Sequence, residues 1–407
     1  MRRLLAAGLG LGIATTTVAA SAGTVTVETH AGRSVRVFVP SKPAAPASLV
    51  VMLHGCTQTG EQFAEATQMD ALAETEGFVV AYPEQSAQTI STKCFQWYEP
   101  AHQARDAGEP KELSDGAAEV VAAHGVDAER VYVAGISAGA AMAVILGATY
   151  PDRFTAIGVV AGIEYKGATS IGEGFTTTTS GGPSPDAQGA LAFTQMGARA
   201  RAVPTFVVHG TSDGVVAKVN GDQVAAQWLK TNTLVLGAGK IDPVAALTGN
   251  AGYPFTRFVY RAKGNGASVI EHYVVDGLGH AWPGGKDGGS YSDKQGPNAS
   301  ALAWGFFKGR TRTAPLDVPP VDVPDSGTSL PDGGTTGPRP PGGDPANPSG
   351  TTPVAGEPGS SSSGGCATSA AGTRAARTAS GTSPVRGIAA ASLAALVTIA
   401  LRRRRRR

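Results

Sequence analysis

Apolar residues follow two alternating patterns between residues 23 and 310. Short runs rich in β-branched residues are typical of strands, and longer stretches with an apolar residue every three or four positions are typical of helices. Because the two patterns alternate, they predict one α/β domain with a largely parallel central sheet flanked by helices. The strands are expected at 34–39, 48–53, 78–82, 130–134, 156–160, 205–209 and 271–275. The helices are expected at 64–76, 112–124, 138–150 and 217–230.

One segment interrupts this alternation. Residues 165–188 contain the run TTTTSGGPSP, which has no clear period of either kind. We expect a flexible excursion over the top of the sheet, and a lid and a plain loop both fit the pattern.

The N-terminus lies outside the pattern and carries a targeting signal. Two arginines precede an apolar run at 4–14, and small residues follow it. This order predicts that residues 1–22 form a secretory signal peptide, cleaved after Ala22 or after Ala20. The run is shorter than the ~20 residues that cross a bilayer. We therefore expect an exported protein, in which disulfides are allowed.

The composition changes abruptly at residue 311. Residues 311–365 are rich in Pro, Gly and Ser and predict a disordered linker. Residues 366–407 then begin with Cys366, continue to an apolar segment at 387–401 and end in the arginine cluster 402–407. This order resembles the C-terminal surface-sorting tails of myxobacterial exported proteins. The resemblance implies that sorting machinery processes the tail and that Cys366 is the anchoring point, whereas a plain tail anchor and an uncleaved basic tail are the alternatives.

Net charge argues against nucleic-acid binding. The formal charge is +2, but eight of the arginines lie at the two ends, and the remainder without them carries −6. A nucleic-acid-binding domain needs a basic surface, so we expect no nucleic-acid partner.

The strongest chemical signal is the sequence GISAG at 135–139. It follows a predicted strand and opens a predicted helix. A strand, a sharp turn of small residues around a serine, and a helix together make a nucleophile elbow. We predict that Ser137 is the nucleophile and that the backbone N–H of Ala138 stabilises the oxyanion.

A serine nucleophile needs a histidine base and a carboxylate that orients the histidine. Asp213 follows a late predicted strand in the sequence GTSDG, and His280 lies in the Gly-rich loop GLGHAW near the end of the domain. We predict that Ser137, His280 and Asp213 form a triad. His209 lies within a strand and is expected to be buried structure.

The loop after the strand at 48–53 is expected to supply the second oxyanion donor. It begins His-Gly-Cys, so the backbone N–H of Cys56 is the predicted donor and His54 is expected to shape the loop. Cys56 and Cys94 are the only cysteines of the domain and are expected to pair after export. Their bond would contribute up to ~4 kcal/mol to stability, and two free thiols are the alternative.

Three aromatic residues are candidates for substrate binding. Trp97, Tyr98 and Trp282 lie in predicted loops near the site. Aromatic faces suit an acyl chain or a phenolic ring, but each side chain could equally pack in the core. Trp282 follows the predicted base by two residues, which favours a functional role.

Several of these stretches, in this order, resemble the extracellular poly(3-hydroxybutyrate) depolymerase-family esterases. They are LVVMLHGCTQTG, CFQWYEP, GVDAERVYVAGISAGAAMAVILGATYPDRF, HGTSDGVV and GLGHAWPGG, between about residues 35 and 307. The resemblance implies an α/β-hydrolase fold, the triad of Ser137, Asp213 and His280, and an oxyanion amide at Cys56. The family also shades into feruloyl and acetylxylan esterases. Similar depolymerases join a substrate-binding domain through their linker, whereas this linker leads only to the tail.

Together these features predict a secreted or surface-attached serine esterase that uses two-step acyl transfer without a metal or an organic cofactor. Its expected substrates are polymeric or oligomeric 3-hydroxyalkanoate esters. A feruloyl or acetylxylan esterase, a peptidase and a non-catalytic surface-binding protein are the alternatives. The oligomeric state stays open.

Overall fold

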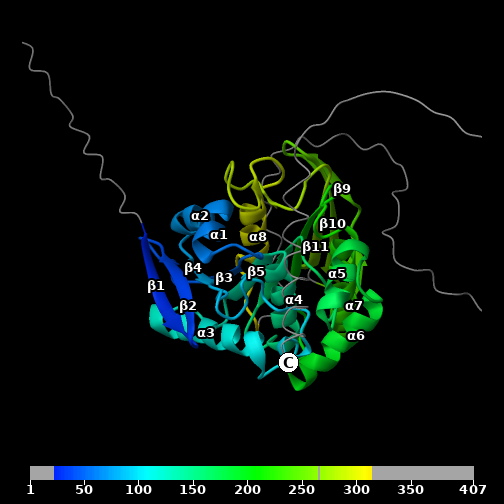
Figure 1. Cartoon of the computed structure of the whole chain (residues 1–407). Coiled ribbons are helices and arrows are strands. Elements are labelled where there is room, and N and C mark those ends of the chain that lie inside the picture. Colours follow the sequence, from blue (N-terminus) through cyan, green and yellow to red (C-terminus); the bar gives the residue numbers. More distant parts are fainter. Residues whose placement is uncertain (1–22, 265, 314–407) are drawn as a thin grey trace, which may run out of the picture. The chain divides into compact units, whose positions relative to one another are not determined.

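A computed structural model describes residues 23–264 and 266–313 (Figure 1). The predicted signal peptide, most of the predicted linker and the predicted sorting tail with Cys366 lie outside the described residues. Among the described residues, no helix is both long and apolar enough to cross a membrane.

Eleven strands of the described chain form one sheet, in the order β1-β2-β4-β3-β5-β6-β7-β11-β10-β8, with β9 paired to β10. The strands from β4 to β11 in this order run parallel, and the outer strands pair antiparallel. Their bounds are β1 Thr24–His30, β2 Arg33–Val39, β3 Leu49–Leu53, β4 Val79–Pro83, β5 Val131–Ile136, β6 Ala156–Val160, β7 Thr205–Gly210, β8 Ile241–Pro243, β9 Leu247–Asn250, β10 Pro254–Ala262 and β11 Ser268–Val275. A separate two-stranded sheet joins β12 Trp282–Pro283 and β13 Ser292–Asp293.

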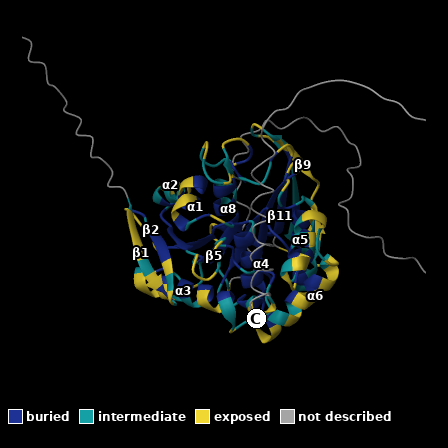
Figure 2. Cartoon of the chain, viewed as in Figure 1, coloured by how far each residue is buried: buried dark blue, intermediate teal, exposed yellow. Residues whose placement is uncertain are grey.

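Helices cover both faces of the large sheet. They are α1 Gly60–Thr67, α2 Met69–Glu76, α3 Gly108–His124, α4 Ala138–Thr149, α5 Ile171–Ser180, α6 Pro185–Met196, α7 Val219–Leu236 and α8 Ala299–Phe307. The side chains of β5 alternate between two core clusters, with Val131 and Val133 in the cluster that contains α4 and Tyr132 in the cluster that contains α8. This alternation follows from the two-residue period of a strand, so the central strands are buried on both faces (Figure 2).

The predicted layout is largely confirmed, with two corrections. The single helix expected at 64–76 is two helices, because Gln68 adopts a left-handed conformation (φ 53°) between α1 and α2. The irregular structure expected at 165–188 is wrong, since this segment contains α5 and the start of α6, and a lid there stays a prediction. The Ser170 side chain caps α5, and Gly181 ends it at a φ of 87°. Threonine is a weak helix former, which hid this helix from the pattern.

Candidate active site

The sheet topology brings the three predicted triad loops to one edge. Ser137 follows β5, Asp213 follows β7 and His280 follows β11. These strands belong to the parallel part of the sheet, where only β6 separates β5 from β7 and β11 lies directly beside β7. Because parallel strands end at the same edge, the three loops gather there, where open α/β sheets bind their ligands.

Ser137 lies in a strained turn between β5 and α4. Its φ of 57° is left-handed, a conformation that costs energy for a residue with a side chain. Its N–H donates to Val160 O at 3.0 Å, and its carbonyl accepts the first helical bond from Ala141 N–H. Glycine is required at position 139, because an added Cβ would lie 2.1 Å from Leu53 O. These are the features of a nucleophile elbow.

Asp213 and His280 are hydrogen-bonded to each other. His280 Nδ1 lies 2.8 Å from Asp213 Oδ2, while Asp213 Oδ1 accepts from the N–H groups of Val215 and Val216 at 2.9 and 2.8 Å. Burial alone would raise the pKa of Asp213, but its contacts with His209 and His280 hold it well below its usual range. An ionised carboxylate only accepts, so Nδ1 of His280 carries the proton and Nε2 is free to act as a base.

Two residues around this pair had not been singled out for the site. His209 is buried, as expected. Its Nε2 donates to Val216 O at 2.8 Å and lies 3.5 Å from Asp213 Oδ2, so it supports the loop that carries Asp213. Tyr291 packs edge-on against His280, with ring centroids 5.8 Å apart. Tyr291 lies in a polar, Gly-rich stretch that carries no sequence signal.

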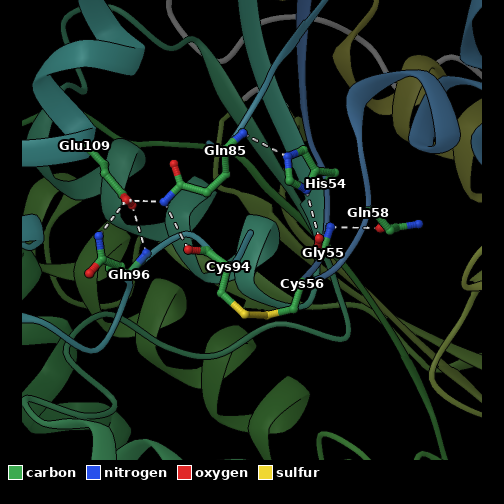
Figure 3. Close-up of a disulfide and its surroundings, with 8 residues drawn as sticks. All are labelled: His54, Gly55, Cys56, Gln58, Gln85, Cys94, Gln96 and Glu109. Atoms are coloured by element: carbon green, nitrogen blue, oxygen red, sulfur yellow. Dashed lines mark hydrogen bonds between the residues drawn. A yellow bond between two sulfur atoms is a disulfide. The ribbon is translucent and has the colours of Figure 1, made fainter. Parts of the chain in front are cut away.

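The two predicted oxyanion donors have no hydrogen-bond acceptor among the described residues. Neither the N–H of Cys56 nor that of Ala138 meets an acceptor within the part of the chain that the structure describes. The loop after β3 also approaches the elbow closely, since a Cβ on Gly55 would lie 3.4 Å from Ser137 Cβ. The predicted Cys56–Cys94 disulfide is confirmed and ties this loop to the segment that leads to Trp97 (Figure 3).

The aromatic candidates separate into two groups. Trp282 is 1% exposed, donates its indole N–H to Ser300 Oγ at 3.0 Å and packs edge-on against Phe63, so its ring lies in the core, and its role in binding substrate stays a prediction. Trp97 and Tyr98 form an edge-to-face pair beside α5, with 7% and 8% of their surfaces exposed. Their role in binding substrate stays a prediction.

The described residues contain no group of three or more His, Cys, Asp or Glu side chains placed to hold a metal ion.

Comparison with known proteins identifies relatives of this chain. The family model "Esterase PHB depolymerase" matches residues 34–245, just over half of the chain. Poly(3-hydroxyalkanoate) depolymerase C of Paucimonas lemoignei is 38% identical over 247 residues, which cover 60% of this chain and 57% of that protein. Acetylxylan esterase A of Aspergillus ficuum is 26% identical over 267 residues, covering 63% and 84% of the two chains. The match thus spans little more than half the length of the depolymerase.

A solved structure supports the fold. The acetyl xylan esterase from Aspergillus awamori superposes with a TM-score of 0.55 at 21% identity, over 70% of this chain and 99% of that one. The predicted α/β-hydrolase fold is confirmed by this likeness and by the mostly parallel sheet. The elbow after β5 and the family match over residues 34–245 lead to one conclusion: the chain belongs to the esterase PHB depolymerase family.

Proposed function

We propose that the chain hydrolyses carboxylic esters with Ser137, His280 and Asp213 as its catalytic triad. The observation that carries this proposal is the 2.8 Å contact of His280 with the ionised Asp213, at the sheet edge where the elbow presents Ser137. The contact orients the imidazole with Nε2 unprotonated, which is the state that a general base needs.

The proposed reaction is a two-step acyl transfer. The hydroxyl of Ser137 gives its proton to His280 Nε2 while its oxygen attacks the ester carbonyl. The negative charge that develops on the carbonyl oxygen is held by the N–H groups of Cys56 and Ala138. His280 then protonates the leaving alcohol, and finally activates a water that releases the acyl group from Ser137.

The substrates that we propose are esters of 3-hydroxyalkanoates. The greater identity to a depolymerase of such polymers, 38% against 26% for an acetylxylan esterase, supports this choice. Acetylated or feruloylated polysaccharides are the alternative, because the relatives include an acetylxylan esterase that matches over most of its own length.

We also propose that the protein acts outside the cell. The Cys56–Cys94 disulfide supports export, because disulfides persist in oxidising compartments. In this proposal residues 1–22 are removed, and sorting machinery anchors the chain at Cys366. Replacing Cys366 with serine should release active esterase into the medium, whereas unchanged retention on the cell surface would argue against anchoring through this cysteine.

Hydrolysis assays test the activity. The exported full-length protein, Ser137→Ala and the exposed control Ser180→Ala are compared on 3-hydroxybutyrate oligomers, methyl ferulate and acetylated xylan. We expect release of 3-hydroxybutyrate by the parent and by Ser180→Ala, and none by Ser137→Ala. Activity retained in Ser137→Ala would refute the triad, and preferential release of ferulate or acetate would move the substrate to polysaccharide esters.

A further inference from the structure

The orientation of the Cys56 N–H depends on the carbonyl of Gly55. The two groups belong to one peptide bond, and among the described residues only the bond between Ala45 and Pro46 is cis. In a trans peptide the C=O and the N–H point in opposite directions within one plane. A contact that holds the Gly55 oxygen therefore also sets the direction of the Cys56 N–H.

His54 makes that contact. Its Nδ1 lies 2.8 Å from Gly55 O, and its Nε2 accepts from the backbone N–H of Gln85 at 3.1 Å. Because Gln85 N–H can only donate, Nε2 is unprotonated and Nδ1 carries the proton that binds Gly55. Burial lowers the pKa of His54 to about 4, so the ring keeps this neutral form at ordinary pH.

Gln85 in turn contacts both segments that the disulfide joins (Figure 3). Its backbone holds His54, and its side-chain amide donates to Cys94 O at 3.0 Å and to Glu109 Oε1 at 2.5 Å. The amide oxygen accepts from Arg33 Nη1 at 2.8 Å. Gln85 is 1% exposed, and its backbone N–H, its side-chain nitrogen and its side-chain oxygen all hydrogen-bond to neighbouring residues.

Glu109 is the last member of this series of hydrogen bonds, which begins at Gly55. Its carboxylate, also 1% exposed, accepts from Gln85, from Gln96 Nε2 at 3.2 Å and from Gln96 N–H at 2.8 Å. It lies in the first turn of α3, where the helix dipole favours a negative charge. A buried carboxylate that loses its hydrogen-bond donors costs free energy. These bonds therefore hold the side chains of Gln85 and Glu109 in place.

We propose that His54, Gln85 and Glu109 form a buried hydrogen-bond relay that aims the Cys56 N–H at the substrate's carbonyl oxygen. The three are positioning residues, and the relay rests on the function proposed above. Its effect falls on the oxyanion, which exists only after attack, so the relay contributes to kcat and leaves KM unchanged.

The test compares two side chains of similar shape at position 54. The full-length His54→Leu removes both ring contacts, whereas His54→Asn keeps a donor near the place of Nδ1. Steady-state hydrolysis of p-nitrophenyl butyrate should show kcat lower by ~100-fold in His54→Leu, the range for a lost oxyanion donor. In His54→Asn we expect a loss of only ~10-fold, because the bond to Gly55 survives. KM should not change in either variant.

Gln85→Met extends the test along the relay, and it also serves if His54→Leu does not fold. Its matched control is Gln227→Met, which removes an equally buried glutamine on α7, far from Cys56 in sequence and bonded to Tyr165 and Thr231. We expect kcat to fall only in Gln85→Met, and affinity for a trifluoromethyl ketone, whose adduct carries an oxyanion, to fall in parallel.

Equal losses in His54→Leu and His54→Asn, or equal kcat values in Gln85→Met and Gln227→Met, would overturn the relay. Ser137→Ala separates the two proposals. If Ser137→Ala is inactive while His54→Leu keeps its kcat, only the relay is refuted; if Ser137→Ala keeps its activity, both are refuted.

Discussion

Glu164 provides a stability prediction, because its carboxyl group is buried without a hydrogen-bond partner among the described residues. It follows β6 and is 2% exposed, and neither side-chain oxygen has a hydrogen-bond partner within residues 23–313. Gly182 fits closely against it, since an added Cβ there would lie 2.8 Å from Glu164 Oε1. Burial raises the pKa of this carboxyl from 4.5 to about 8.

The sign and the size of the effect follow from linkage. Between pH 4.5 and about 8 the unfolded chain has lost this proton while the folded chain keeps it. The free energy of unfolding therefore falls as pH rises through that window and is flat outside it. At ~1.4 kcal/mol per pKa unit the whole fall is at most about 5 kcal/mol, and water that enters on ionisation would reduce it.

Urea unfolding of the parent and of Glu164→Gln between pH 4 and 9 measures this effect. The glutamine is neutral throughout, so its advantage over the parent should be smallest near pH 4 and grow to a few kcal/mol by pH 9. The control is Glu173→Gln on α5, where bonds from Thr169 lower the pKa of an exposed carboxyl, so any pH dependence should have the opposite sign. An advantage of Glu164→Gln that is constant with pH, or largest at low pH, would refute a raised pKa.

Three other changes give distinct outcomes. Asp213→Asn should lower kcat by ~10⁴-fold with little change in KM, because the amide no longer selects the His280 tautomer; a kcat within tenfold of the parent would contradict the assignment. Replacing Cys56 and Cys94 together by serine should lower the free energy of unfolding in urea by up to ~4 kcal/mol, and an unchanged midpoint would contradict this value. Trp282→Phe should cost ~1 kcal/mol of stability for the lost bond to Ser300 and leave KM unchanged; a raised KM at unchanged stability would support a binding role.

The parts of the fold that sequence could predict are those where a local pattern and a backbone requirement coincide. The central strands are buried on both faces, so each appears as a short apolar run. Ser137 is recognisable because a strained turn between a strand and a helix demands small neighbours, and Gly139 meets that demand against Leu53 O. His280 and Asp213 follow strands in Gly-rich loops, which is a second local signal.

Other features have no local signal, because they depend on contacts between distant segments. The outer strands β8 and β9 are short and largely exposed, so they carry no apolar run. Trp282 lies beside the predicted base in sequence, yet Ser300 and Phe63 hold its ring in the core. Proximity in sequence to a catalytic residue does not decide which way a large aromatic side chain points.

The relay shows the same limit for polar residues. Glu109 lies in the first turn of α3, where an acidic residue is common for reasons of the helix dipole alone. Gln85 follows β4 in an unremarkable polar loop. What distinguishes both is that they are buried and bonded across 24 residues of chain, and burial of a polar group requires partners that a single sequence does not name. The proposed nucleophile can therefore be found from a motif, whereas the residues that we propose aim the oxyanion amide become visible only when β3, β4 and α3 are placed together.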